Sequence, residues 1–387
     1  MELSTLQEKF VSVFEKESEA SFFAPGRVNL IGEHIDYNGG LVFPCAITLG
    51  TYAVAAKRCD NLFRAYSANF EDLGVIEFSL DDLSYNKDHN WCNYVKGVLK
   101  YLIEAGHTIN TGFDVLVFGN IPNGSGLSSS ASLEILMCKV FTDLYSLSLT
   151  SVEAALLGKK VENEYIGVNS GIMDQFAIAL GMQNHALLLD CNTHEYKHIP
   201  FELAGYSIVI MNTNKRRELA DSKYNERRGE CESALSKLQK VFNIEALCEL
   251  TEDKLEEVEK IINHPIEFKR AKHAITENVR VIAATKALEQ GDLITFGKLL
   301  NESHISLRYD YEVTGIELDT LVTAAWEADG VLGARMTGAG FGGCSIAIVE
   351  NDKIDDFINH VNKKYVETIG YEASFYIASI GNGPKQI

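Results

Sequence analysis

A change in hydrophobic period marks the stretch between residues 113 and 144. Residues 113–118 (FDVLVF) are β-branched or aromatic enough to predict a buried strand. Further along, apolar side chains recur at helical spacing, at Leu133, Leu136, Met137, Val140, Phe141 and Leu144. Residues 122–131 (PNGSGLSSSA), between these two segments, are rich in glycine and serine. The sequence therefore predicts a glycine-rich turn that leads from a strand into the first turn of a helix.

The same periodicities predict the other elements of the chain. Strands are expected at 48–56, 63–70, 77–80, 187–190, 206–211, 345–349 and 373–380. Helices are expected at 91–103, 151–166, 219–242, 251–262, 265–290, 293–302, 316–328 and 354–368. An amphipathic helix lies within the first twenty residues, where Ser4 and Gln7 have the spacing of a capping box, and Ser151 is expected to cap its own helix. The last helix and strand complete a split βαβ pattern.

The turn at 122–131 has the chemistry of an anion site. Gly124 and Gly126 permit backbone angles that are closed to other residues and let a ligand approach the main chain. The serines at 128–130 supply capping hydroxyls, and the free N–H groups of a first helical turn carry partial positive charge. An ordinary capped helix would explain part of this pattern, but three serines behind two glycines exceed what capping requires. We therefore predict that the turn binds phosphate.

Length and charge limit the classes of protein that the chain can represent. Its 387 residues are too many for one typical core, so we expect two domains, 1–200 and 201–387, which meet at Pro200. The net charge of −19 argues against nucleic acid or an anionic membrane surface as a partner. A phosphate ligand is itself anionic, so helix dipoles, a divalent cation and a few basic residues must reverse the field locally.

The cysteines and the N-terminal segment indicate a cytoplasmic protein. None of the eight cysteines is spaced as part of a zinc pair, and several stand in apolar runs, so we expect them to be reduced and mostly buried. The first twenty residues are acidic and amphipathic, unlike a signal peptide, and no apolar run approaches the length of a membrane span.

Ionisable residues gather on a glycine-rich segment near the N-terminus. Residues 24–40 (APGRVNLIGEHIDYNGG) hold Glu33, His34 and Asp36 within four positions, which indicates the lip of a pocket. One histidine with two acids matches no standard metal site. Carboxylates accept hydrogen bonds from neighbouring hydroxyls, so a sugar suits these residues better. A solvated turn explains the segment about equally well.

Two further segments are candidates for the same site. Residues 336–344 (MTGAGFGGC) contain four glycines within six positions, so we expect close contact with a ligand or with the other domain. Asp174 opens a predicted helix and precedes an apolar run that would partly desolvate it. A favourable pairing of charge and helix dipole is the plainer explanation of this aspartate. Arg27 carries little weight on its own, because most arginines lie on surfaces.

Three of these segments together resemble the motifs of one family. The turn at 122–131 is not a P-loop, because no lysine follows Gly126, and the H-R-D and D-F-G elements of protein kinases are absent. It is similar to the phosphate loop P-x-x-x-G-L-S-S-S-A of the GHMP small-molecule kinases. The stretches GRVNLIGEHIDYNGG from Gly26 and MTGAGFGGC from Met336 look like the first and third motifs. The Glu-His-x-Asp within the first is the form found in galactokinases.

The resemblance implies a fold and an activity. The fold would be α+β, with a ribosomal-protein-S5-like N-terminal domain, a ferredoxin-like C-terminal domain and the active site between them. The activity would be that of a monomeric galactokinase, a sugar kinase that uses Mg²⁺ and ATP to phosphorylate the C1 hydroxyl of galactose, the first committed step of galactose metabolism. One alternative is an N-acetylgalactosamine kinase. Another is a non-catalytic sensor of ATP and galactose, although such sensors are defective in the serine–alanine part of the phosphate loop, which is intact here.

The same resemblance implies roles for individual residues. ATP would be bound by Ser67, Gly124, Ser125, Gly126, Leu127, Ser128, Ser129 and Ser130. Mg²⁺ would be held by Ser130 and Glu162. The sugar would be bound by Glu33, His34, Ile35, Asp36 and Tyr224. Asp174 would face the reacting hydroxyl, and Arg27 beside it would favour the ionised carboxylate.

Overall fold

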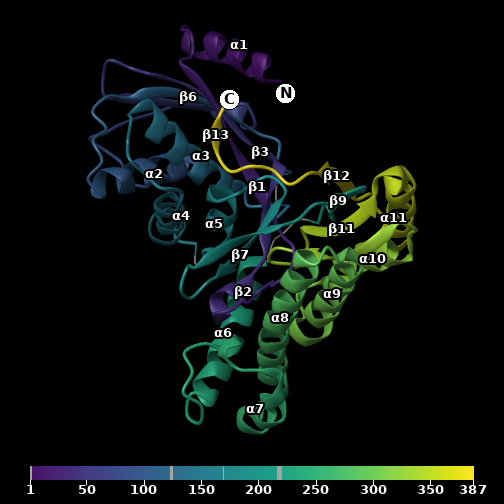
Figure 1. The fold of residues 1–387 in the computed structure, drawn as a ribbon. Coiled ribbons are helices and arrows are strands. Elements are labelled where there is room, and N and C mark those ends of the chain that lie inside the picture. The colour runs from purple at the N-terminus through teal and green to yellow at the C-terminus, as the bar shows by residue number, and fades with distance from the viewer. Residues whose placement is uncertain (1, 123–124, 169, 216–219) are drawn as a thin grey trace.

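The computed structural model describes residues 2–122, 125–168, 170–215 and 220–387 (Figure 1). The helices are α1 (Leu3–Phe14), α2 (Cys92–Glu104), α3 (Ser129–Leu144), α4 (Ser151–Lys160), α5 (Met173–Ala179), α6 (Ala220–Leu238), α7 (Leu255–Ile262), α8 (Pro265–Glu289), α9 (Leu293–Ser306), α10 (Gly315–Glu327) and α11 (Ile354–Ile369). The strands are β1 (Ala20–Asn29), β2 (Leu41–Val42), β3 (Pro44–Lys57), β4 (Leu62–Ser67), β5 (Ile76–Ser79), β6 (Phe113–Gly119), β7 (His185–Asp190), β8 (Tyr196–Pro200), β9 (Tyr206–Asn212), β10 (Val331–Thr337), β11 (Cys344–Glu350), β12 (Ser374–Ala378) and β13 (Lys385–Gln386). The π-helical segments η4 (Val161–Ile166) and η7 (Leu307–Tyr311) continue α4 and α9.

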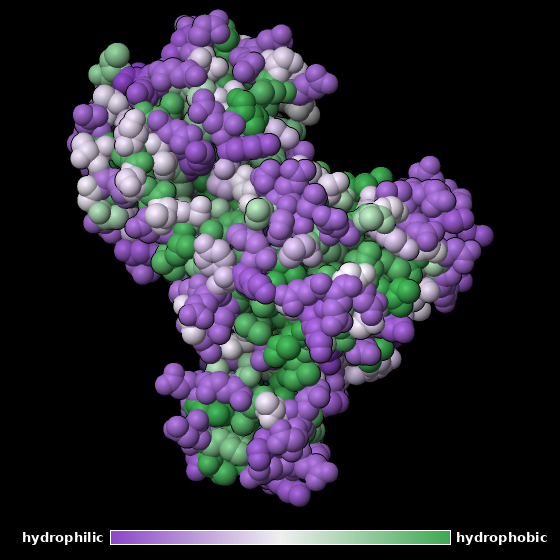
Figure 2. All heavy atoms as spheres, in the orientation of Figure 1, coloured by the Kyte–Doolittle hydropathy of each residue, from purple (hydrophilic) through white to green (hydrophobic). Residues whose placement is uncertain are grey.

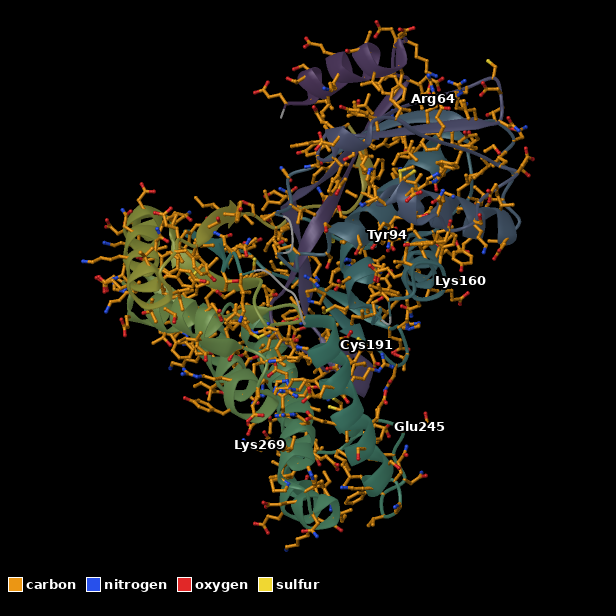
Figure 3. All side chains as sticks on the ribbon, turned by 180° about the vertical axis from the view of Figure 1, so that it is seen from behind. Arg64, Tyr94, Lys160, Cys191, Glu245 and Lys269 are labelled. Carbon is orange, nitrogen blue, oxygen red and sulfur yellow. The ribbon has the colours of Figure 1, made fainter. Side chains whose placement is uncertain are left out.

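The N-terminal half is built on a sheet with the strand order β13-β1-β3-β6-β4-β5. Helix α3 packs against β1 and β3, and α2 packs against α3. Helix α1 lies on the opposite side of the sheet (Figure 1) and buries Leu6, Phe10 and Phe14, because their spacing places them on one helical face. Arg64 of β4 lies beside the end of this helix (Figure 3), with its guanidinium 5.1 Å from the centre of the Phe14 ring. The first large sheet is therefore covered on both faces.

The C-terminal half contains an antiparallel sheet with the strand order β10-β11-β9-β12. Helices α10 and α11 pack against each other beside this sheet, and their apolar faces share a core with β9 and β11. Along the chain the elements run β9, helices, β10, β11, α11 and β12. This order confirms the split βαβ pattern that the sequence predicts.

The two halves are joined by elements that cross between them. The chain returns at its end so that β13 pairs with β1, with Phe22 opposite Gln386.

A smaller sheet has the order β2-β7-β8, and α6, α7 and α8 form the lobe at the bottom of Figure 1. Hydrophilic residues cover most of the outer surface in Figure 2, and hydrophobic residues gather where this lobe joins the rest. One continuous apolar core accordingly runs from the first sheet to α9.

Several local predictions differ from the structure. The structure contains five strands that the sequence does not predict, which are β1, β2, β8, β10 and β13. Helix α1 begins at Leu3 behind Glu2 and has no side-chain cap, so the capping box at Ser4 and Gln7 is wrong. Helix α4 is capped by Thr150, whose hydroxyl and backbone N–H both pair with Glu153, rather than by Ser151. Most of the cysteines are buried, as predicted. No helix in the described parts of the chain is long and apolar enough to cross a membrane.

Candidate active site

The serines at the start of α3 face carboxylates on neighbouring elements. Ser128 precedes the helix in a left-handed conformation, with φ of 62°, and its hydroxyl makes no capping hydrogen bond. Instead, Ser128 Oγ donates to Asp174 Oδ2 at 2.5 Å, and Ser130 Oγ donates to Glu162 Oε1 at 2.5 Å. The prediction that these hydroxyls cap the helix is therefore wrong. Their partners lie on α5 and η4, so the turn ties three elements together.

The turn itself rests on β1. The guanidinium of Arg27 donates through Nη1 to the Gly126 carbonyl oxygen at 2.7 Å, and the Arg27 backbone N–H donates to the Leu127 carbonyl at 3.3 Å. Gly26 must lack a side chain here, because an added Cβ would lie 2.9 Å from the Leu127 carbonyl oxygen. On its other side the turn meets the third glycine-rich segment, where a Cβ on Gly338 would lie 3.0 Å from the Gly126 carbonyl. The close contact expected of this segment is confirmed.

Asp174, in the first turn of α5, is held by donors from two directions. Arg27 Nε and Nη2 each lie 2.8 Å from Asp174 Oδ1, and the Ser128 hydroxyl bonds the other oxygen. The Arg27 side chain is 5% exposed, whereas that of Asp174 is 32% exposed. The carboxylate is thus fixed in orientation while one side of it remains accessible from the adjoining cavity.

Asp36 faces the same cavity from the 3₁₀ turn η1 (Asp36–Asn38). It lies against Gly171, where an added Cβ would clash with the Asp36 carboxylate. Burial, together with the negative charges of Asp174 and Glu33, raises the pKa of Asp36 to about 6. Two carboxylates, those of Asp36 and Asp174, therefore line the same cavity.

Glu33 is fixed by the C-terminal half of the chain. Its side chain is buried, and Arg335 Nη2 of β10 lies 2.8 Å from Glu33 Oε2. Helix α8 holds the backbone beside it, because His273 Nε2 donates to the Glu33 carbonyl at 3.0 Å and Gly32 N–H donates to Glu277 Oε1 at 2.9 Å. These contacts leave Glu33 on the cavity wall with one carboxylate oxygen committed to an internal ion pair.

The ring nitrogens of His34 both have partners inside the protein. Nδ1 lies 2.8 Å from the Tyr37 hydroxyl, and Nε2 lies 3.1 Å from the Ala339 carbonyl oxygen. The ring packs 5.5 Å from that of Tyr224, centre to centre. Burial lowers the pKa of His34 to about 3, and the positive charge of Arg335 acts in the same direction. His34 is therefore neutral, and its ring forms part of the cavity wall.

A cavity of about 450 Å³ brings most of the predicted residues together. Its walls include Arg27, Glu33, His34, Asp36, Glu162, Asp174 and Tyr224 among the predicted residues, and Ser170, Gly171, Met173, Asn225, Gly338 and Ala339 besides. Ile35 does not face the cavity, because its buried side chain packs on Gly40. Ser67 is buried at the end of β4, and Ser125 is buried in the turn. Ser129 is exposed, and Gly124 lies outside the described residues.

The oxygen pair of Ser130 and Glu162 fits Mg²⁺ as part of a site completed by phosphate. Both are hard oxygen donors, they meet at 2.5 Å, and Glu162 is nine-tenths buried. Mg²⁺ is usually held by one or two carboxylates together with substrate phosphates and water. Among the described residues no group of three or more histidine, cysteine, aspartate or glutamate side chains is arranged to hold a metal.

Sequence reasoning missed the residues that support the site from behind. Arg335, His273 and Glu277 contact the first motif, yet each stands within an ordinary strand or helix pattern. Arg335 lies one position before MTGAGFGGC, and this adjacency is the one signal that pointed to it. Nothing in the spacing of His273 and Glu277 on α8 distinguished them from solvated residues of a helix.

Comparisons with known proteins agree along the whole chain. Residues 8–57 match the family profile "Galactokinase galactose-binding signature", residues 93–182 match "GHMP kinases N terminal domain" and residues 284–367 match "GHMP kinases C terminal". The chain is 62% identical to a galactokinase of Clostridium perfringens strain SM101 over 387 residues, which is 100% of both chains. It is 59% identical to a galactokinase of Streptococcus suis over 385 residues, which covers 100% of this chain and 99% of that one.

Solved structures show the same relationship. Lactococcus lactis galactokinase complexed with galactose is 52% identical and superposes with a TM-score of 0.96, covering 100% of both chains. Methanococcus jannaschii mevalonate kinase, at 22% identity and a TM-score of 0.67 over 94% of this chain and 98% of that one, shares the fold. The architecture is thus the two-domain GHMP kinase fold of mixed helices and sheets that the sequence predicts. The chain belongs to the galactokinases of the GHMP kinase family.

Proposed function

We propose that the protein is a galactokinase that transfers the γ-phosphoryl group of ATP to the C1 hydroxyl of D-galactose, which yields galactose 1-phosphate and ADP. One observation carries the proposal. Asp174, oriented by Arg27 and Ser128, shares a cavity with Asp36 and lies beside the glycine-rich turn that opens α3. The reaction requires a carboxylate for the reacting hydroxyl, a second carboxylate for the sugar and a positively polarised helix start for the phosphates.

The roles follow from the contacts of each residue. Asp174 accepts the proton of the C1 hydroxyl, because its carboxylate is the one that arginine orients at the edge of the cavity. Arg27 stabilises the negative charge that develops on the transferring group, and its bond to the Gly126 carbonyl fixes it beside the turn. Phosphoryl transfer asks a protein for positioning and charge stabilisation more than for covalent chemistry. The rigid grouping of Arg27, Asp174 and Ser128 supports this mechanism.

The remaining site residues divide between the two substrates. The turn at 124–130, with Ser67, is proposed to bind ATP. Ser130 and Glu162 would hold Mg²⁺, which would neutralise phosphate charge when bound. Glu33, Asp36 and Tyr224 would bind the sugar hydroxyls. His34 and Ile35 would shape that side of the site, since the His34 ring nitrogens and the Ile35 side chain are engaged within the protein.

Three broader features stay proposals. We place the domain boundary at residues 200 and 201, next to the end of β8, although β13 returns to the first sheet. The state of the protein is proposed to be monomeric, and its location cytoplasmic, in keeping with its mostly buried cysteines. Analytical ultracentrifugation of the purified chain tests the oligomeric state directly.

The decisive experiment offers the protein Mg-ATP with galactose, glucose, N-acetylgalactosamine or no sugar, and identifies products by phosphorus and proton NMR. We expect galactose 1-phosphate as the main product. Preferred phosphorylation of N-acetylgalactosamine would assign the protein to that activity. Binding of galactose and ATP without turnover would make it a sensor. Either of these results would overturn the proposal.

A further inference from the structure

A continuous chain of hydrogen bonds runs behind the sugar side of the cavity. His34 Nδ1 lies 2.8 Å from the Tyr37 hydroxyl, which lies 2.8 Å from the Tyr311 hydroxyl. The Tyr311 hydroxyl in turn lies 3.1 Å from Cys231 Sγ. At the opposite end, His34 Nε2 meets the Ala339 carbonyl at 3.1 Å. The chain therefore connects the first motif with η7, with α6 and with the third glycine-rich segment.

The Ala339 carbonyl fixes the direction of every bond in this chain. A carbonyl oxygen only accepts hydrogen bonds, so His34 carries its proton on Nε2. Because the neutral ring then has a lone pair on Nδ1, Tyr37 donates to it and accepts from Tyr311. Tyr311 correspondingly accepts from the Cys231 thiol.

Two further observations agree with this direction. Asn38 Nδ2 donates to Cys231 Sγ at 3.7 Å, which leaves the thiol proton for Tyr311. Burial raises the pKa of both Tyr37 and Tyr311, so each hydroxyl keeps the proton that the chain requires. Tyr311 and Cys231 are at most 1% exposed, which excludes water as a substitute partner without rearrangement.

We propose that Tyr37 and Tyr311 are positioning residues for sugar binding, which act by fixing His34 as the Nε2–H tautomer bonded to Ala339. The inference rests on the proposed galactokinase activity and adds two residues to it. Tyr311 is fully buried, so it acts through Tyr37 and His34 and does not touch the sugar.

The position of His34 explains why its orientation matters. It lies between Glu33 and Asp36 with φ of 62°, a left-handed conformation that is costly for a side-chain-bearing residue and must be held by its surroundings. Its ring packs between those of Tyr224 and Tyr311, at 5.5 and 4.9 Å. A change in the ring would therefore shift the backbone that presents both carboxylates.

The reacting groups lie on other elements. Arg27, Ser128 and Asp174 belong to β1, the turn before α3 and α5, and none of them bonds to the chain of tyrosines. Loss of this chain of hydrogen bonds should therefore weaken galactose binding more than it slows the chemical step.

The test removes the Tyr37 hydroxyl in Tyr37→Phe, the Tyr311 hydroxyl in Tyr311→Phe and both hydroxyls in the double variant. Each single change should raise KM for galactose by about 5- to 30-fold, the effect of leaving a buried hydrogen-bonding group unpaired, while kcat changes by less than about threefold. The double variant should be little worse than the weaker-binding single variant, because either deletion interrupts the same chain. NMR of the ¹⁵N-histidine protein, with His34 assigned from a His34→Gln spectrum, should show the Nε2–H tautomer in the parent and its loss in Tyr37→Phe.

Tyr365→Phe is the matched control. Tyr365 is also fully buried, and its hydroxyl donates to the Thr213 carbonyl at 2.7 Å in the α11 core, away from the cavity. Its loss should lower stability and leave KM for galactose unchanged, and it should add independently to Tyr311→Phe.

Additive KM effects in the Tyr37 and Tyr311 double variant, an equal KM effect in Tyr365→Phe, or an Nδ1–H tautomer in the parent would each overturn the proposal. The tautomer is measured without turnover. If the parent protein lacks galactokinase activity yet shows the Nε2–H form, the proposed activity is refuted but the chain of hydrogen bonds to His34 is supported.

Discussion

Replacing Asp174 with asparagine separates the chemical role of this carboxylate from its structural role. Asparagine keeps the shape of the side chain and can still accept a hydrogen bond from Arg27, but it cannot accept a proton from the sugar. A positioned general base typically contributes about 10²- to 10⁴-fold to the rate, or about 2.7 to 5.4 kcal/mol of barrier. We expect kcat of Asp174→Asn to fall by this factor.

The structure limits the other effects of the same change. Removing one partner of a fully buried ion pair costs about 3 to 5 kcal/mol. The Asp174 side chain is 32% exposed, and asparagine can retain a hydrogen bond from Arg27, so the loss of folding free energy should be smaller, about 1 to 3 kcal/mol. Galactose affinity should change by less than about tenfold, because Glu33, Asp36 and Tyr224 remain in place.

The assay combines steady-state kinetics, calorimetric titration with galactose and thermal unfolding. Asp143→Asn is the control, because it removes an aspartate from a Lys139 ion pair of 2.9 Å on α3, remote from the cavity, and should leave kcat unchanged. A folded Asp174→Asn protein with kcat within about threefold of the parent would exclude Asp174 as the general base.

The remaining predictions concern the metal and the sugar. Ser130→Ala and Glu162→Gln should each raise the Mg²⁺ concentration that gives half-maximal rate, because a hard oxygen ligand is lost; identical Mg²⁺ titrations would place the cation elsewhere. With the pKa of Asp36 raised to about 6, kcat/KM for galactose should rise by about tenfold per pH unit below pH 6 and level off above it, and Asp36→Asn should lack this step. The folded protein holds this proton more tightly than the unfolded chain does, so the contribution of Asp36 to stability should fall as pH rises from about 4 to about 6. Asp36→Ala should lose far more kcat/KM on galactose than on 4-deoxygalactose, since a site built around a hydroxyl rejects a mispaired sugar by as much as about 10⁴-fold; equal losses would show that Asp36 does not contact the C4 hydroxyl.

Local chemistry explains why much of the site was predictable. The β-branched and aromatic run at 113–118, followed by helical spacing of apolar residues from Leu133, predicts a turn between a strand and a helix, and the structure has both β6 and α3 at the expected residues. The glycines at 338 and 340 predicted close contact because only a missing side chain permits it, and Gly340 indeed lies against the Val313 carbonyl. Such constraints act over a few residues, so a sequence displays them directly.

The hydroxyl of Ser128 shows where local reasoning ends. A serine before a helix is usually a cap, but the Ser128 hydroxyl instead donates a hydrogen bond at 2.5 Å to Asp174, which is 46 positions away in the chain. A hydrogen bond from a serine hydroxyl to a charged carboxylate is stronger than one from a backbone N–H to a serine oxygen. Only the fold brings Asp174 next to Ser128, so the sequence alone does not show this partner.

The residues that hold the sugar side of the site lie still further along the chain. Glu33 pairs with Arg335 across 302 positions, and the backbone beside it is held by His273 across 240 positions. On their own elements these residues follow the pattern of an ordinary strand and an ordinary helix, so no periodicity marks them. Their function follows from burial instead, because a buried arginine or histidine must find an acceptor, and the first motif supplies it. The proposed sugar side of the site is therefore supported by both halves of the chain, although its candidate carboxylates belong to one short segment.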